Sequence, residues 1–105
     1  IENDTEFQKI FLARDLALLI NTLYSIEGGV EYYYSFDRLD LSNFQFDFKP
    51  VGAEEKYVVS VKDSSIMKIY PYAKPASEKS PDAISQAMKL KFHRSDNELT
   101  VTKNE

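Results

Sequence analysis

Residues 7–29 read FQKIFLARDLALLINTLYSIEGG, and this stretch decides the first part of the fold. It holds no Gly or Pro before its last two residues, and Leu, Ala, Lys, Gln and Arg, which favour helix, are frequent in it. Just upstream, Thr5 and Gln8 have the spacing of a capping box, in which the two side chains satisfy free backbone N–H groups. The Gly28-Gly29 pair ends the pattern, because glycine adopts the left-handed conformation of a helix C-terminal cap without strain. We therefore predict one long helix over residues 5–25.

The predicted helix is more apolar than a surface helix needs to be. Its fully polar stripe is narrow and consists of Gln8, Asp15 and Thr22. Phe11 and Leu18 lie on the far side, beyond the two apolar rows. The first row comprises Ile10, Ala13, Ala17, Ile20 and Tyr24, and the second comprises Leu12, Leu16, Leu19 and Leu23. We expect this helix to be covered on one side by its own sheet and on a second side by something further.

After the helix, the hydrophobic period changes from about 3.6 to 2, the period of a strand. Phe44, Phe46 and Phe48 alternate with polar residues and are predicted to face the core. Residues 83–87 could be a short helical turn or the start of a strand. Short connections favour antiparallel neighbours, since parallel pairs need long crossovers. The sequence thus predicts an α+β fold, with one long N-terminal helix packed on an antiparallel meander of five to six strands, at residues 30–36, 44–49, 56–61, 66–70, 88–93 and 98–102.

The chain has 105 residues, which is the size of a single domain. Residues 71–81 contain three prolines together with Ser, Lys and Glu, so they are predicted to form an exposed loop. This loop is too short to separate two domains. We expect residues 1–105 to fold as one unit, with the helix over residues 5–25 and the meander over residues 30–103.

Composition restricts the classes of function. The net charge of -4 disfavours nucleic acid as a partner, because a duplex-binding domain normally presents a basic face. The chain has no cysteine, which excludes disulfides, thiolate metal sites and cysteine nucleophiles. Only 3 Gly and 4 Pro are present, so low-complexity and collagen-like classes are excluded.

Residues that could support catalysis are few. The only histidine, His93, is predicted on the polar side of a strand, and nothing resembling a nucleophile elbow surrounds the nearby Ser95 and Asp96. The acidic residues of the two predicted turns are better explained as turn formers than as metal ligands; they are Asp37, Asp40, Glu54 and Glu55. We predict a protein that is not an enzyme and that uses no cofactor and no metal.

Two charges, Arg14 and Asp15, interrupt the apolar part of the helix. Neighbouring helical residues do not face each other, so the two are not a mutual ion pair. Two interpretations stay open: both lie at the edge of the polar stripe, or one of them binds a partner chain or a strand backbone. With Phe11 and Leu18 they are the candidate partner-binding residues.

Tyrosine provides the second candidate site, since the chain has 7 Tyr and no Trp. Side chains alternate along a strand, so Tyr33 points away from the face shared by its two tyrosine neighbours. Together with Tyr57, Tyr70 and Tyr72 it could stack on a glycan or peptide ligand. Tyrosine is also a good strand residue with one polar end, so packing is the alternative explanation. A free sheet edge could bind a peptide without any special side chain.

The segment from Phe7 to Tyr24 resembles the juxtamembrane helix of small archaeal membrane-anchored proteins, in which a similar A-R-D-L-A-L-L-I stretch precedes a β-rich ectodomain. The order of one helix followed by a meander is also similar to that of type IV pilin-like subunits. The resemblance implies that a membrane segment precedes Ile1 and that the domain lies on the extracytoplasmic side.

These observations lead to one principal hypothesis. The chain is a structural or interaction domain, the soluble part of a membrane-anchored or pilin-like protein, and it associates through its apolar helix. The expected partner is a second copy or a protein of a membrane complex, with no nucleic acid. A glycan- or peptide-binding module is the alternative.

Overall fold

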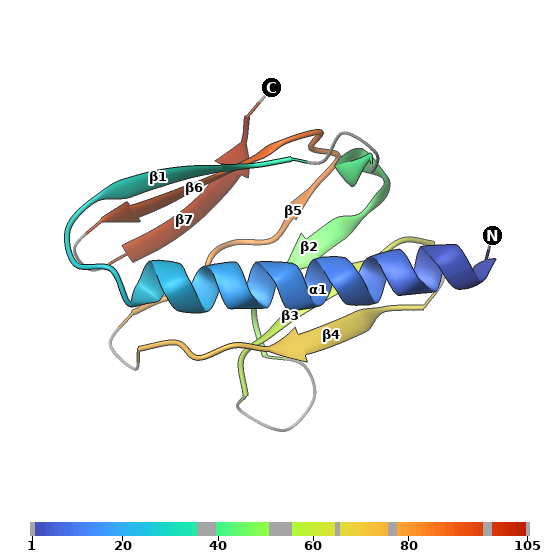
Figure 1. The fold of residues 1–105 in the computed structure, drawn as a ribbon, viewed down its shortest axis with the longest axis horizontal. Coiled ribbons are helices and arrows are strands. Elements are labelled where there is room, and N and C mark those ends of the chain that lie inside the picture. The colour runs from blue at the N-terminus through green and yellow to red at the C-terminus, as the bar shows by residue number, and fades with distance from the viewer. Residues whose placement is uncertain are drawn as a thin grey trace.

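The structure is a computed structural model of the chain (Figure 1). It describes residues 2–35, 40–50, 56–64, 66–75, 78–95 and 98–104, with side chains from residue 6 onward.

The helix α1 spans Glu2–Tyr24. It begins before the predicted start, so Thr5 lies within the helix and the predicted capping box is wrong. At the other end, the Ser25 N–H donates to the Thr22 carbonyl at 3.1 Å. Gly28 has a φ of 89° and turns the chain toward the first strand, four residues after the helix has ended. The long helix is therefore confirmed, but its end does not depend on the glycines.

In the part of the chain that the structure describes, seven strands and one short 3-10 helix follow, and every strand pair is antiparallel. The strands are β1 (Val30–Tyr34), β2 (Gln45–Asp47), β3 (Val58–Lys62), β4 (Lys68–Pro71), β5 (Ile84–Ser85), β6 (Leu90–Ser95) and β7 (Glu98–Lys103), and the 3-10 helix η1 is Leu41–Asn43. They form a three-stranded sheet in the order β1-β6-β7 and a four-stranded sheet in the order β4-β3-β2-β5. The α+β class is confirmed, whereas the strand number and the single meander are corrected.

The correction has a physical reason. Only β2, β3 and β4 follow one another as a meander. The first strand instead pairs with β6, so that Tyr34 lies opposite Leu90 and Val30 opposite Arg94. The ambiguous segment 83–87 contributes β5, which pairs with β2. Periodicity shows where a strand lies but not which strand it pairs with. The β1–β6 pairing builds the three-stranded sheet, and the β2–β5 pairing adds a strand to the four-stranded sheet.

The two sheets meet where β5 contacts β7, and α1 lies across them (Figure 1). The helix packs against β3 and β4. On one flank, the Asn21 side chain accepts a hydrogen bond at 2.7 Å from the Ala73 N–H, just after β4. On the other flank, the Tyr34 hydroxyl of β1 donates to the Asp15 carboxylate at 2.8 Å. The strands therefore surround one side of the helix and leave its opposite side open.

The core lies between α1 and the two sheets. Phe44, Phe46 and Phe48 are buried, as their alternation predicts. They pack with buried residues of the helix and with the inner residues of β6 and β7. The helix residues include Leu12, Leu16 and Ile20, and the strand residues are Leu90, Phe92, Leu99 and Val101. Ile10 of the first apolar row and Tyr32, which shares a strand face with the buried Tyr34, are about half exposed. Ile10 lies at the edge of the helix face, and Tyr32 lies on an edge strand.

The segment 71–81, predicted to be an exposed loop, packs on the core at several points. Tyr72 is buried, and its hydroxyl donates to the Phe48 carbonyl. Its ring stacks on that of Tyr24, whose own hydroxyl donates to the Lys79 carbonyl at 3.0 Å. Prolines indicate an irregular backbone, but they do not determine whether that backbone is covered.

A buried ion pair holds this segment in place. Glu78 and Arg94 are 8% and 5% exposed, and their side chains form a two-point contact in which Arg94 Nη2 lies 3.1 Å from Glu78 Oε2. The guanidinium also lies over the Tyr24 ring, with its Cζ 5.3 Å from the ring centre. The same Nη2 lies 3.4 Å from the Tyr24 carbonyl at the end of α1. Arg94 therefore joins the helix end, the loop and the three-stranded sheet, although its sequence position indicated only a turn.

Removing the acid from this pair should be costly. Glu78→Gln leaves the Arg94 charge buried without its counter-ion, so we expect the free energy of unfolding in urea to fall by about 3–5 kcal/mol. Glu31→Gln is the matched control, because Glu31 forms an exposed ion pair with Lys91 at 3.0 Å. Exposed pairs contribute little, and the control should unfold almost as the parent does. Equal losses in the two variants would show that the Glu78–Arg94 pair does not anchor the loop.

The buried tyrosines make stability sensitive to alkali. Burial raises the pKa of Tyr24 to about 12, and it also raises the pKa of Tyr34 and Tyr72 above the ordinary value of 10.0. In the unfolded chain these phenols ionise near pH 10. Their contribution to stability is therefore fully present below pH 10 and is lost as the pH rises above it.

We expect a group of phenols in the native protein to ionise only as the chain unfolds. Phenolate absorbance and circular dichroism, recorded together from about pH 9 to about pH 13, would show the late absorbance step coinciding with loss of secondary structure. The urea-unfolded chain serves as the reference. If all seven tyrosines ionised near pH 10 with the secondary structure intact, the described burial would be contradicted.

A candidate interaction surface on the outer side of the helix

The open side of α1 carries large apolar side chains. Phe7, Phe11 and Leu18 are 69%, 44% and 49% exposed. They are spaced four and seven residues apart, so they follow one line along the helix. This spacing is typical of a seam that packs against another helix. The prediction that Phe11 and Leu18 lie beyond the two apolar rows is confirmed.

The four residues predicted to bind a partner lie together. Phe11, Arg14, Asp15 and Leu18 line a shallow hollow of about 200 Å³, and we call these four residues the helix patch. Phe11 and Leu18 are about 20° apart around the helix axis and about 10 Å apart along it. Arg14 and Asp15 are about 100° apart, one on each side of the line that joins them. The helix patch is thus apolar along the helix and oppositely charged across it.

The two charges of the helix patch differ in their surroundings. Asp15 is half-buried, and its Oδ2 accepts the hydrogen bond from Tyr34. Arg14 is exposed and forms no ion pair with any described residue. One interpretation left open by the sequence was that Arg14 or Asp15 binds a strand backbone. Asp15 does contact a strand, but it accepts a hydrogen bond from a tyrosine side chain and not from the backbone. The guanidinium of Arg14 stays available to a carboxylate from outside.

Strand β4 extends the apolar surface on one flank of the helix. Tyr70 lies on β4, which is an edge strand, and is 36% exposed; Ile66 and Met67 just before it are also exposed. Lys9 of α1 is fully buried and ties this flank to the helix, because its Nζ donates to Asp63 Oδ1 at 3.0 Å. The same ammonium donates to the Ile66 carbonyl. This buried lysine was not predicted, since its place in an otherwise apolar row is the only signal that it leaves in the sequence.

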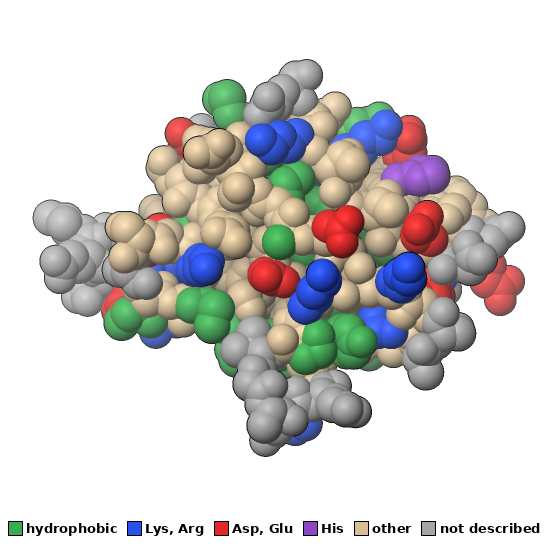
Figure 2. Space-filling model, turned by 180° about the vertical axis from the view of Figure 1, so that it is seen from behind, with side chains coloured by type: hydrophobic (Ala, Val, Ile, Leu, Met, Phe, Trp, Pro, Cys, Tyr) green, Lys and Arg blue, Asp and Glu red, His purple; other side chains and the backbone are tan. Residues whose placement is uncertain are grey.

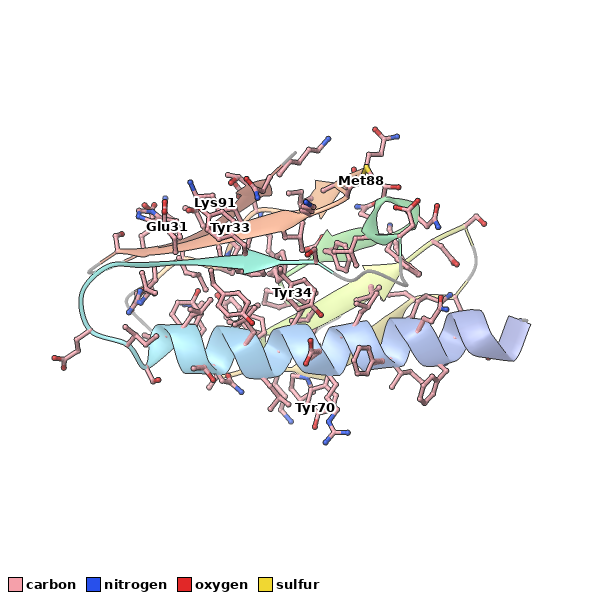
Figure 3. All side chains as sticks on the ribbon, turned by 45° about the horizontal axis from the view of Figure 1, so that its top comes forward. Glu31, Tyr33, Tyr34, Tyr70, Met88 and Lys91 are labelled. Atoms are coloured by element: carbon pink, nitrogen blue, oxygen red, sulfur yellow. The ribbon has the colours of Figure 1, made fainter. Side chains whose placement is uncertain are left out.

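The four tyrosines proposed for ligand stacking do not share a face. Tyr33 lies on the outer side of the three-stranded sheet beside Glu31 and Lys91, while Tyr70 lies on the far side of α1 (Figure 3). The Lys91 ammonium is 6.0 Å from the centre of the Tyr33 ring. Tyr57 and Tyr72 lie elsewhere and contact each other edge to face, with ring centres 6.1 Å apart. The structure therefore brings together one pair and separates the other two.

Tyr57 borders an open hollow of about 520 Å³. The hollow is lined by Lys49, Pro50, Tyr57, Lys74, Glu78, Lys79, Ser80 and Asp82. However, the Lys74 ammonium lies 4.6 Å from the centre of the Tyr57 ring and donates at 2.8 Å to the Pro75 carbonyl. A stacking ligand would have to displace this ammonium from the ring face.

The residues considered for catalysis or metal binding are dispersed. His93 is exposed opposite Glu31 on the outer side of the three-stranded sheet, and Ser95 is half-buried at the end of β6. Asp40 caps η1, as a turn-forming role predicts, by accepting from the Ser42 N–H at 3.0 Å. Hydrogen bonds from the Ser42 hydroxyl and N–H lower the pKa of the Asp40 carboxyl.

The other acidic residues considered in the sequence lie outside the described residues; they are Asp37, Glu54, Glu55 and Asp96. Among the residues that the structure describes, no three His, Asp or Glu side chains gather as metal ligands. Within the same part of the chain, no helix is long and apolar enough to cross a membrane.

The surface opposite α1 differs from the helix side. Seen from behind, it carries Lys and Arg side chains interspersed with Asp and Glu (Figure 2). Among the described residues, Phe7, Phe11 and Leu18 are exposed in a line along α1, and Ile66, Met67, Ile69 and Tyr70 are exposed on and just before β4. Comparison of the chain with protein families, curated proteins and solved structures finds no match. The surface is therefore interpreted from its own geometry.

The hydrogen bond that orients Asp15 can be tested by a single substitution. Tyr34→Phe removes the hydroxyl and leaves the ring, whose edge contact with Phe92 has ring centres 6.3 Å apart. We expect thermal or urea unfolding to show a loss of about 1–2 kcal/mol, typical of one hydrogen bond to a partly exposed carboxylate. Tyr33→Phe is the control, because its hydroxyl makes only a 3.5 Å contact with Glu31 on the surface. A loss in the control as large as in Tyr34→Phe would contradict this assignment.

Proposed function

We propose that this chain is a non-enzymatic interaction domain and that the outer side of α1 is its docking surface for another protein. The observation that carries the proposal is the line of exposed Phe7, Phe11 and Leu18 beside an exposed Arg14 that forms no ion pair with a described residue. Large apolar side chains in a line are a feature of interfaces, whereas isolated ones are normal on any surface.

The composition of the helix patch also supports this role. Aromatic residues and arginine are enriched among the interface residues that contribute most of the free energy of binding. Here a phenylalanine and an arginine border the same hollow. The hollow is shallow, so it suits a side chain from a partner better than an enclosed small molecule.

The domain also provides a rigid support for such a surface. The inner side of α1 is fixed by buried residues such as Leu12, Leu16 and Ile20, each with no exposed area. Lys9 and Asn21 tie the β4 flank to the helix, and Asp15 ties the β1 flank. A docking surface that is ordered in advance loses less conformational entropy on binding.

Attachment of the domain to a membrane, on the extracytoplasmic side and in a pilin-like assembly, stays a prediction from the resemblance of residues 7–24. The proposed docking surface does not depend on it. A partner in a membrane complex and a second copy of the chain would both fit an apolar helix face.

The alternative function, a module that binds a glycan or peptide, is supported only by the hollow beside Tyr57. Its basic lysines would suit an acidic group on a ligand. The separation of Tyr33 and Tyr70 from this hollow weakens the stacking version of the hypothesis. Peptide addition to the edge strand β4 needs none of these tyrosines.

Photo-crosslinking tests the docking surface directly. A photoreactive phenylalanine analogue replaces Leu18 in the full-length protein within its native cells, and a matched variant carries it at His93, which is exposed on the opposite sheet. We expect defined protein adducts from position 18 and few from position 93, because only the former lies in the proposed interface. Mass spectrometry identifies the adducts. Absence of adducts at position 18, or equal yields at both positions, would contradict the proposal.

A further inference from the structure

We propose that the partner bound by the helix patch is a second copy of this chain, with the two α1 helices packed in parallel around a two-fold axis. This inference rests on the proposed function, since it uses the same surface and names its occupant. The observation behind it is that a two-fold axis can place the opposite charges of two helix patches beside each other.

A two-fold axis allows two ways of packing one helix face on its copy. If the axis runs along the helices, they are parallel, and the left flank of one helix meets the right flank of the other. If the axis runs across the helices, they are antiparallel, and each flank meets the same flank of the copy. In both arrangements the central line of one helix packs on the central line of the other.

The charges of the helix patch distinguish the two arrangements. Arg14 and Asp15 lie on opposite flanks of the line through Phe11 and Leu18. Parallel packing therefore places Arg14 beside Asp15 of the partner subunit, and symmetry repeats this pair on the other flank. Antiparallel packing centred on the helix patch would instead place like charges together, which is unfavourable.

The apolar residues fit the parallel arrangement as well. The central Phe11 and Leu18 each pack on their own copy, as residues of a parallel helix seam do. Phe7, four residues before Phe11, continues the same seam and is the most exposed of the three. The two ion pairs then lie beside a dry apolar line, where water screens them less than on an open surface.

The internal contacts of the domain prepare Asp15 for this role. The Tyr34 hydroxyl occupies its Oδ2 at 2.8 Å and holds the carboxylate at the edge of the helix face. Among the described residues, none donates a hydrogen bond to the Oδ1 atom of Asp15. Arg14 lacks an ion-pair partner among the described residues, so each copy offers the charge that the other needs.

Partly exposed side chains beside the helix can enlarge the interface. Tyr70 on β4 and Tyr32 on β1, both partly exposed, flank the helix and can extend the contact beyond the seam.

Sedimentation equilibrium of the full chain, from about 1 μM to about 1 mM, tests the occupant. We expect the parent to dimerise, and Arg14→Glu and Asp15→Lys each to weaken the dimer by about tenfold or more, since each replaces two attractive pairs by two repulsive ones. The double variant Arg14→Asp/Asp15→Arg exchanges the signs and should dimerise again. Glu31→Lys, which reverses a charge on the outer side of the three-stranded sheet, far from the helix patch, is the control for altered charge and should stay dimeric.

Disulfide cross-linking tests the orientation. Because the chain has no cysteine, each introduced thiol is the only one in its chain. Leu18→Cys should oxidise to a covalent dimer with itself, and Phe11→Cys should do the same, because each residue lies near its own copy in the parallel arrangement. His93→Cys, on the opposite sheet, should not. A bond that forms only between position 11 of one chain and position 18 of the other would overturn the parallel arrangement.

A monomer at every concentration would overturn the second copy as the occupant. The photo-crosslinking experiment separates this result from failure of the proposed function. Adducts at position 18 with a different protein would leave the docking surface standing and remove only the dimer. Absence of adducts at that position would remove both.

Discussion

The fold depends most on one buried ion pair, that between Arg94 and Glu78. Arg94 is on β6, Glu78 is in the segment before β5, and the guanidinium also contacts the Tyr24 ring and carbonyl at the end of α1. Helix ends leave carbonyl groups without partners, and α1 has no basic residue in its own last turn. A basic residue from 70 positions later supplies that charge. Because one side chain serves three segments, the loop, the sheet and the helix end keep a fixed relation.

That arrangement determines which part of the helix is available. The two sheets meet at β5 and β7, so β1 and β4 come to lie on the two flanks of α1. The inner residues of the helix fill the space between the sheets. Phe7, Phe11 and Leu18 stay exposed because none of the described strands lies over that side of the helix. The same topology places Tyr34 within reach of Asp15 and so sets one of the two charges of the helix patch.

Some of this could be predicted from the sequence, for identifiable reasons. Helix periodicity located α1, and it also separated Phe11 and Leu18 from the buried rows. Period-2 alternation located the buried Phe44, Phe46 and Phe48. The pairing of β1 with β6 and of β5 with β2 could not be predicted, because the hydrogen bonds that decide pairing leave no local pattern.

The predictions for the candidate site divide in the same way, into features set by one helix and features set by the topology. The grouping of Phe11, Arg14, Asp15 and Leu18 depends on spacing along one helix, so the sequence was enough to predict it. The four tyrosines come from three separate segments, and their relative positions depend on the topology. Lys9, Glu78 and Arg94 were missed because buried charges are recognised only by what surrounds them. Their sequence neighbours indicated an apolar row, an exposed loop and a turn.

The pairing of β1 with β6 has a consequence for how the chain folds. The first strand follows α1 directly, yet its hydrogen-bonding partner begins at Leu90, near the end of the chain. Contacts between residues so far apart form slowly, because the intervening chain must first be ordered. During synthesis, α1 and β1 emerge well before the strand that pairs with β1. Until the C-terminal hairpin arrives, the edge of β1 is unpaired, so loss of the last two strands would leave a nascent chain prone to aggregate.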